Sequence, residues 1–226
     1  MSAVASRLEP VVATLQVRRL GCRPYDEVLA LQESLLAAVA DGAPETLLLL
    51  EHPPVYTLGR GADAADLRGA PERLRVPCFR VGRGGGATFH GPGQLVAYPI
   101  VRLRAAGRDV HGYVRALEQA LIDGCAAFGV AASTPSGETG VWVGERKIGS
   151  IGIGVRHGVA YHGIALNVTT DLGYFDAITV CRSDGLRLVN LAELCSPAPD
   201  LDAVGAAFAP ALAARLGREL AEVAWR

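Results

Sequence analysis

The sequence has little of several features that would assign it to a specialised class of protein. Its formal net charge is only −1, with a pI of about 6.5, so overall charge gives no reason to expect binding to nucleic acid or to a membrane surface. The longest apolar run, TLLLL, is far too short to span a bilayer. The N-terminal stretch has neither the basic start nor the sustained apolar segment of a secretory signal, and we expect none. With 50% apolar and 20% charged residues, the composition is that of one folded domain.

Cysteine is also scarce. The cysteines form an odd and scattered set without a CxxC pair: Cys22, Cys78, Cys125, Cys181 and Cys195. This pattern favours reduced thiols in the cytoplasm over a disulfide framework or a zinc site, so we expect a cytoplasmic protein without a metal.

Lysine is the rarest basic residue. Of 22 lysines and arginines, Lys147 is the only lysine. Arginine stays charged at any working pH, whereas a desolvated lysine can lose its proton. A lone lysine is compatible with codon drift, but it also indicates a residue that exchanges a proton.

The apolar pattern predicts the main elements. We expect a helix over about 28–39 and buried strands within 46–58, 76–82 and 94–101, followed by a second helix over 109–128. Two glycine-rich strands, 147–155 and 159–168, form a hairpin around the sequence RHG. The C-terminal part reads as helical, with a break or kink at Pro210. Because strands outnumber helices and pair locally, the expected fold is α+β, with a mixed or antiparallel sheet flanked by helices.

A glycine-dense stretch, VGRGGGATFHGPGQLVAYP, runs from Val81 to Pro99. Gly82, Gly84 and Ala87 fit the spacing of a dinucleotide fingerprint, but the sequence that follows cannot form the helix which that motif requires. Two interpretations then stay open. The stretch is either an ordinary long loop or a length of backbone that an elongated ligand approaches closely.

The predicted hairpin has a face of small residues. In KIGSIGIGV, Ser150, Gly152 and Gly154 alternate with larger residues, and Gly163 and Ala165 alternate in the partner strand. Glycines on one strand face usually indicate close approach by a ligand or by another backbone. Lys147 lies at the entrance to this hairpin.

Cys181 is the best candidate for a reactive thiol. It ends an apolar run and opens a polar segment, which suggests a place at the edge of the core. Cys22 lies in a polar context, Cys78 and Cys125 lie in apolar contexts typical of core thiols, and Cys195 fits either role. A thiol is a nucleophile only as the thiolate, which a nearby cation or base favours.

Three segments together resemble a known family. RGGGATFHGPGQLVAYPI, GERKIGSIGIGVRHGVAYHGIALNV and the downstream cysteine are similar to the octanoyl-[acyl carrier protein]:protein N-octanoyltransferases, or lipoyl(octanoyl) transferases, of the biotin/lipoate protein ligase-like superfamily. The likeness spans about residues 45–195, within a single catalytic domain of residues 1–226. It implies an acyltransferase of the EC 2.3.1 class that acts in lipoate biosynthesis.

The resemblance implies roles for particular residues. Cys181 would carry the octanoyl group as a thioester, and Lys147 would lower the pKa of that thiol and act as acid and base. The acyl chain would lie along a set of residues from both motifs: Arg83, Gly84, Gly85, Gly86, Ala87, Thr88, Phe89, His90, Ser150, Ile151, Gly152, Gly163, Ile164 and Ala165.

The resemblance also implies partners. The donor would be octanoyl-acyl carrier protein, and the acceptors would be lipoyl domains of 2-oxoacid dehydrogenases and the glycine cleavage H protein. We expect a monomer that needs no cofactor, because transfer from a thioester to an amide is downhill. The family usually has Pro-Cys-Gly-Ile at the nucleophile, whereas this chain has Val180-Cys181-Arg182-Ser183.

Three other functions are compatible with these residues. An ATP-dependent lipoate or biotin protein ligase would share the fold and a lysine of this kind. A non-catalytic binder of acyl groups or lipoyl domains would have lost activity at the altered cysteine segment. A cysteine–histidine hydrolase would pair Cys181 with His90 or His162.

Overall fold

The computed structural model describes residues 13–68, 72–73, 75–103, 109–179 and 186–223, and the structural statements below concern these residues. The strands and helices, in chain order, are β1 (Thr14–Cys22), α1 (Tyr25–Ala40), β2 (Glu45–Glu51), β3 (Val55–Leu58), β4 (Cys78–Arg80), β5 (Ala87–His90), β6 (Gln94–Arg102), α3 (Val110–Ala126), β7 (Val141–Val143), β8 (Arg146–Arg156), β9 (Val159–Asn167), α4 (Leu201–Leu216) and β10 (Glu219–Glu222). Short 3₁₀ helices occupy Ala64–Leu67, Leu172–Ala177 and Leu191–Glu193.

The strands form two sheets. The large sheet has the order β10-β1-β2-β6-β9-β8-β7, and the small sheet has the order β4-β3-β5. In the large sheet β1 is parallel to both of its neighbours, while the other pairs are antiparallel. The expected α+β fold with a mixed sheet is therefore confirmed.

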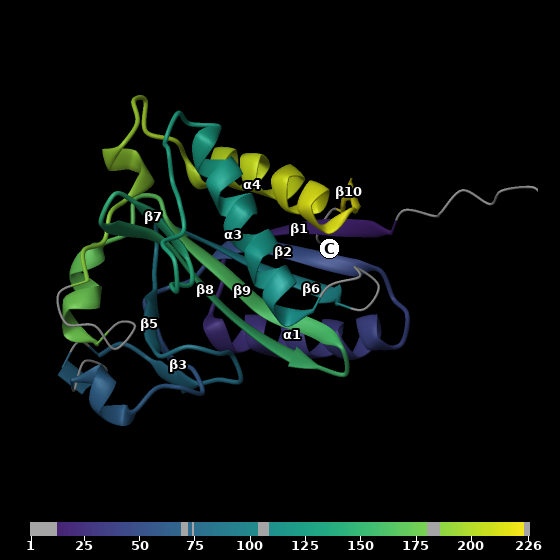
Figure 1. The fold of residues 1–226 in the computed structure, drawn as a ribbon. Coiled ribbons are helices and arrows are strands. Elements are labelled where there is room, and N and C mark those ends of the chain that lie inside the picture. The colour runs from purple at the N-terminus through teal and green to yellow at the C-terminus, as the bar shows by residue number, and fades with distance from the viewer. Residues whose placement is uncertain (1–12, 69–71, 74, 104–108, 180–185, 224–226) are drawn as a thin grey trace, which may run out of the picture.

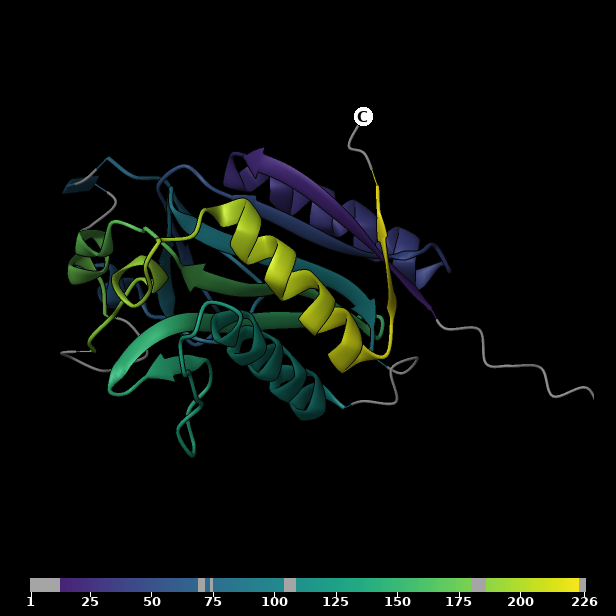
Figure 2. The ribbon, with the colours of Figure 1, turned by 90° about the horizontal axis from the view of Figure 1, so that it is seen from above.

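Helices cover both faces of the large sheet. α1 packs on one face, where Val28 joins Leu48, Val96 and Ala165 in an apolar cluster. α3 and α4 lie together on the other face, as Figures 1 and 2 show, and close the largest apolar cluster of the protein. Since β2 is buried along nearly its whole length, its continuous apolar run is that of an internal strand.

The predicted hairpin is β8–β9. Its turn is His157–Gly158, with φ of +53° and +75°, the left-handed pair that a tight type I′ turn requires. In the ladder Ser150 pairs with Ala165 and Gly152 with Gly163. The small residues of the two strands are therefore neighbours on one face, as the alternation predicted.

The C-terminal region differs from the expectation. α4 continues without a break through Pro210 and ends at Leu216, and the left-handed conformation of Gly217 (φ +66°) caps it. Pro210 is exposed, while Val204, Phe208 and Leu212 on the opposite face of the helix are buried, so packing holds the helix across the proline. The helical prediction is wrong beyond this cap, because Glu219–Glu222 pairs in parallel with β1.

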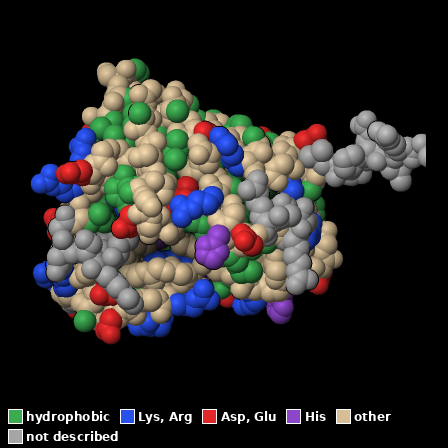
Figure 3. Space-filling model, viewed as in Figure 1, with side chains coloured by type: hydrophobic (Ala, Val, Ile, Leu, Met, Phe, Trp, Pro, Cys, Tyr) green, Lys and Arg blue, Asp and Glu red, His purple; other side chains and the backbone are tan. Residues whose placement is uncertain are grey.

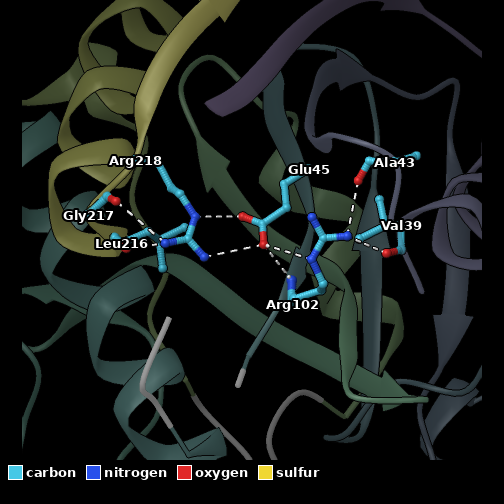
Figure 4. A network of polar contacts seen from close by, with 7 residues as sticks. All are labelled: Val39, Ala43, Glu45, Arg102, Leu216, Gly217 and Arg218. Atoms are coloured by element: carbon cyan, nitrogen blue, oxygen red, sulfur yellow. Dashed lines mark hydrogen bonds and ion pairs between the residues drawn. The ribbon is translucent and has the colours of Figure 1, made fainter. Parts of the chain in front are cut away.

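Glu45 ties this last segment to the middle of the fold, as Figure 4 shows. Its carboxylate, 1% exposed, lies 2.7 Å from Nε of Arg218 and also accepts a hydrogen bond from the backbone N–H of Arg102. The side chain of Arg102 donates in turn to the carbonyls of Val39 and Ala43 at the end of α1. One buried carboxylate thus joins β2, β6, α1 and the start of β10.

Among the described residues, no helix is both long and apolar enough to cross a membrane.

Candidate active site

A cavity of about 360 Å³ lies along β8 and β9, between the large sheet and the glycine-rich loop that precedes β5. Its lining includes almost all of the predicted site residues, namely Arg83, Gly84, Gly85, Gly86, Ala87, Thr88, His90, Lys147, Ser150, Ile151, Gly152, Gly163, Ile164 and Ala165. The structure therefore brings the two sequence motifs together around one cavity.

Lys147 lies at one end of the cavity, near the start of β8. Its side chain is buried, and its Nζ donates to the carbonyl of Thr139 at 3.2 Å. The same nitrogen lies 4.7 Å from the centroid of the Trp142 ring, which faces it across the β7–β8 ladder. A carbonyl dipole and an aromatic face thus fix the position of the amine.

The loop that carries Thr139 is held by a buried carboxylate of α3. Glu118 is 3% exposed, its Oε1 accepts from the backbone N–H of Gly140 at 3.1 Å, and its Oε2 pairs with Arg115. Gly140 has a φ of +116°, and a Cβ there would lie 2.9 Å from Cε of Lys147. A glycine is needed at this position both for the backbone conformation and for the space beside the lysine.

Cys181 and its neighbours 180–185 lie outside the described residues. The segment that follows them contacts the lysine directly. The backbone N–H of Lys147 donates to the carbonyl of Arg187 at 2.8 Å, and its carbonyl accepts from Val189 at 3.1 Å. Before the gap, the N–H of Thr179 donates to the carbonyl of Asp66 at 2.7 Å. Leu188, seven positions after Cys181 in the chain, is thus the bridge partner of Lys147.

The glycine-rich loop is fastened to the open edge of β8. The N–H of Gly84 donates to the carbonyl of Ile153 at 2.8 Å. The guanidinium of Arg83 is buried and donates to the hydroxyl and carbonyl oxygens of Thr57 and to the carbonyl of Gly84. A Cβ on Gly152 would lie only 3.0 Å from Cδ of Arg83, so the loop packs closely against the strand.

Among the predicted site residues that the structure describes, Phe89 alone does not line the cavity. Its ring is 1% exposed and stacks on Tyr174, with centroids 4.4 Å apart and an interplanar angle of 2°. It belongs to the apolar cluster beneath the small sheet. The alternation of β5 explains this placement, since Phe89 and His90 point to opposite sides of the strand.

Several lining residues were not predicted from the sequence. They are Tyr25, Arg60, Tyr98, Val110, Val114, Thr139, Ile153 and His162. Only His162 carried a signal, as a polar residue between small and apolar neighbours in a buried strand. Tyr25, Tyr98, Val110 and Val114 depend on the packing of α1, β6 and α3 beside β8, which no local pattern shows. Arg60 and Thr139 come from loops, and Ile153 lies on β8 itself.

Two of three buried imidazoles, His90 and His162, line the cavity, and the ring of His52 lies 5.9 Å from that of His90, centroid to centroid. Burial lowers the pKa of His52 to about 4, that of His90 to about 3 and that of His162 to about 4. The hydrogen bonds agree with neutral rings, since Nδ1 of His52 donates to the carbonyl of Arg23 while its Nε2 lies 3.0 Å from the hydroxyl of Tyr98.

The other cysteines differ in burial. Cys125 is buried in the main core, as predicted, whereas Cys78 lies half-buried on β4 and Cys195 is half-buried beside that core. Cys22 is exposed at the end of β1. Burial raises the pKa of Cys78 and raises that of Cys125 to about 12, so neither thiol is activated.

A second cavity, of about 650 Å³, lies between the ends of β1 and β2 and residues 198–202. It contains none of the predicted site residues. On the face drawn in Figure 3, acidic and basic side chains of the described residues are interspersed.

The chain has the fold of lipoate-protein ligases and biotin protein ligases. A solved lipoate-protein ligase A bound with ATP shares the fold with a TM-score of 0.76 at 18% identity, covering 96% of this chain and 90% of that chain. The biotin protein ligase from Aquifex aeolicus does so with a TM-score of 0.52 at 11% identity, over 89% and 68% of the two chains.

Sequence similarity gives the family. Residues 24–213 match the lipoyl protein ligase A/B catalytic domain. The octanoyltransferase of Geobacter metallireducens is 52% identical over 184 residues, which cover 80% of this chain and 83% of that relative. The chain belongs to the lipoyl protein ligase A/B catalytic domain family and, within it, to the octanoyltransferases.

Proposed function

We propose that this acyltransferase moves an octanoyl group from octanoyl-acyl carrier protein to a lysine of a lipoyl domain, through a thioester on Cys181. Octanoyl transfer in lipoate biosynthesis follows from the family to which the chain belongs. The donor, the covalent intermediate and the residue roles are our proposal. Lipoyl domains of 2-oxoacid dehydrogenases and the glycine cleavage H protein are the proposed acceptors.

One observation carries the proposal: the only lysine of the chain is buried at the end of a cavity walled by small residues. An acyl chain needs a narrow apolar slot, and the glycines of the loop and of β8 and β9 provide backbone that such a chain can approach closely. A buried amine at the end of that slot is suited to proton transfer at the acyl carbonyl.

The first chemical step makes the acyl-enzyme. The thiolate of Cys181 attacks the thioester carbonyl of the donor, the carbon–sulfur bond to the carrier breaks, and the carrier thiolate leaves. Lys147 takes the proton of the Cys181 thiol and gives it to the leaving sulfur.

The second step makes the product. The neutral amine of the acceptor lysine attacks the Cys181 thioester, an amide forms, and the thiol of Cys181 is restored with a proton from the attacking amine. An arginine at 147 could not serve, because its guanidinium does not give up a proton in proteins.

The main test combines mass spectrometry with substitution. After incubation with octanoyl-acyl carrier protein, the intact enzyme should gain one octanoyl mass, and Cys181→Ser should abolish this adduct. Lys147→Arg should lower transfer at least about 100-fold, as expected for loss of acid–base catalysis. Cys78→Ser and Cys125→Ser are the matched controls and should keep the adduct. Active enzyme without any adduct would contradict the covalent mechanism.

The competing functions give other results. A ligase would support exchange between ATP and pyrophosphate in the presence of octanoate, whereas the proposed transferase should not. A hydrolase that used His90 or His162 as its base would need an imidazole with a pKa near the working pH. Burial holds the pKa of both rings well below that value, at about 3 and about 4.

A further inference from the structure

The cavity has a direction along the hairpin. Its lining on β8 runs from Lys147 to Ile153, and on the antiparallel strand β9 it runs from Ala165 back to His162. Ile153 and His162 are ladder partners, so they mark the end opposite the lysine. Further along the hairpin, Gly154 and Tyr161 pair with each other and are not part of the lining.

The length of this slot suits a medium acyl chain. The amine of Lys147 lies close to Gly140, which also packs against the carbonyl of Gly149. From Gly149 to Ile153 the strand advances about 13 Å, at about 3.3 Å per residue. An extended octanoyl chain covers most of such a distance, so its methyl end would lie beside His162.

His162 is held in an unusual conformation. It has a φ of +57° in the middle of a strand, a left-handed conformation that a non-glycine residue adopts only when its surroundings impose it. Its backbone N–H donates to Oε1 of Gln32 at 2.9 Å, and Gln32 is fully buried on α1. Helix α1 therefore sets the backbone that places this ring.

The ring itself is packed against aromatic side chains. Its centroid lies 4.5 Å from that of Tyr161 and 6.3 Å from that of Tyr98, and the residue is 1% exposed. Nε2 is buried and has no hydrogen-bond partner among the described residues. Burial and the charge of Arg83 lower the pKa of this imidazole to about 4, so at neutral pH it is an uncharged wall.

We propose that His162 forms the end wall of the acyl cavity and thereby limits the chain length of the acyl group that the enzyme transfers. The inference rests on the proposed function, because it assigns the lysine end of the cavity to the acyl carbonyl. In this arrangement a longer chain would have to displace the imidazole, while a shorter chain would leave part of the cavity unfilled.

The test replaces the side chain of His162 by a hydrogen atom. His162→Gly removes the wall, and glycine adopts a positive φ without strain. We expect the ratio of kcat/KM for decanoyl over octanoyl donors to rise about 10- to 20-fold, because each buried methylene contributes about fourfold. His162→Phe, which is bulkier, should shift the preference toward hexanoyl.

The chain offers a matched control. His157 also has a positive φ, +53°, but lies exposed in the hairpin turn. His157→Gly also places glycine at a position of positive φ. It should leave the ratio of kcat/KM for decanoyl over octanoyl donors unchanged.

The outcomes separate this inference from the proposed function. If wild-type enzyme forms no octanoyl adduct, the proposed function fails and the inference fails with it. If wild-type enzyme forms the adduct and folded His162→Gly keeps the wild-type ratio, only the end-wall assignment is overturned. Folding of each variant is checked by its thermal melting curve. If His162→Gly does not fold, an unchanged ratio in folded His162→Phe overturns the assignment equally.

Discussion

At the scale of single residues, the three buried histidines impose a pH dependence on the fold. Each imidazole is neutral in the folded protein, because burial lowers its pKa from the usual 6.5 to about 3 or 4. In the unfolded chain the same rings titrate near 6.5. Between these values the unfolded state therefore binds more protons than the folded state.

The free energy of unfolding should fall as the pH is lowered from 7 to 5. A group whose folded pKa is depressed below its unfolded value contributes its full stability above the unfolded pKa, and that stability is lost as the pH falls toward the folded pKa. The loss should reach at most about 1.4 kcal/mol per pH unit for each histidine. Urea titrations at pH 7, 6 and 5 measure this loss. A free energy of unfolding that stays constant over this range would contradict the lowered pKa of the three imidazoles.

The sequence indicated the environment of a single residue where its type was rare in the chain or unusual for its neighbours. The lone lysine predicted a special environment, and the structure places Lys147 in a buried contact with Thr139 and Trp142. The contribution of Glu118 could not be predicted, because a glutamate on a helix usually faces solvent. Its burial depends on the loop at Gly140, which folds back onto α3.

At the scale of elements, the β8–β9 pair depends on its small residues. Gly163 faces β6 so closely that a Cβ would lie 2.7 Å from Cδ of Pro99 and even closer to the carbonyl of Ala97. The strand has no room for a side chain at this point.

Gly163→Ala should therefore destabilise the protein by about 1–3 kcal/mol, the usual range for overpacking. Gly86→Ala is the comparison, since a Cβ there would meet no atom within 4 Å. Its free energy of unfolding should stay within about 0.5 kcal/mol of wild type. Chemical denaturation of both variants measures the difference, and equal stabilities would show that β9 can move away from β6.

Elements with a strong local sequence pattern could be predicted. Elements that form only because they pair with a distant strand could not. The alternation in β8 and β9 predicted correctly that their small residues share one face, because small residues leave a clear period of two. β10 has the sequence ELAE, which favours a helix, and it is a strand only because β1 offers it a free parallel edge. The break expected at Pro210 does not occur, since the packed face of α4 holds the helix together there.

At the scale of the whole molecule, Glu45 connects the C-terminal strand with the centre of the sheet. The Arg218 side chain that pairs with it is 6% exposed, so removal of the carboxylate would leave the buried guanidinium without its ion-pair partner. The exposed ion pair between Arg19 and Glu222 also links β1 with β10, but its side chains are 35% and 64% exposed.

We expect Glu45→Ala to lower the free energy of unfolding by about 3–5 kcal/mol. Arg19→Ala, which breaks the exposed pair, should cost less than about 1 kcal/mol. Thermal and urea unfolding distinguish the two. Similar losses for both variants would mean that Glu45 is hydrated rather than buried, contrary to the network in Figure 4.

The position of the lysine amine is a property of several chain segments rather than of one side chain. Trp142 lies on β7, Thr139 on the loop before it, and the backbone partners Arg187 and Val189 far along the chain. A graft of this site onto another sheet would therefore need all of these segments in the same register. A lysine introduced alone would lack the carbonyl, the indole and the neighbouring backbone that position its amine.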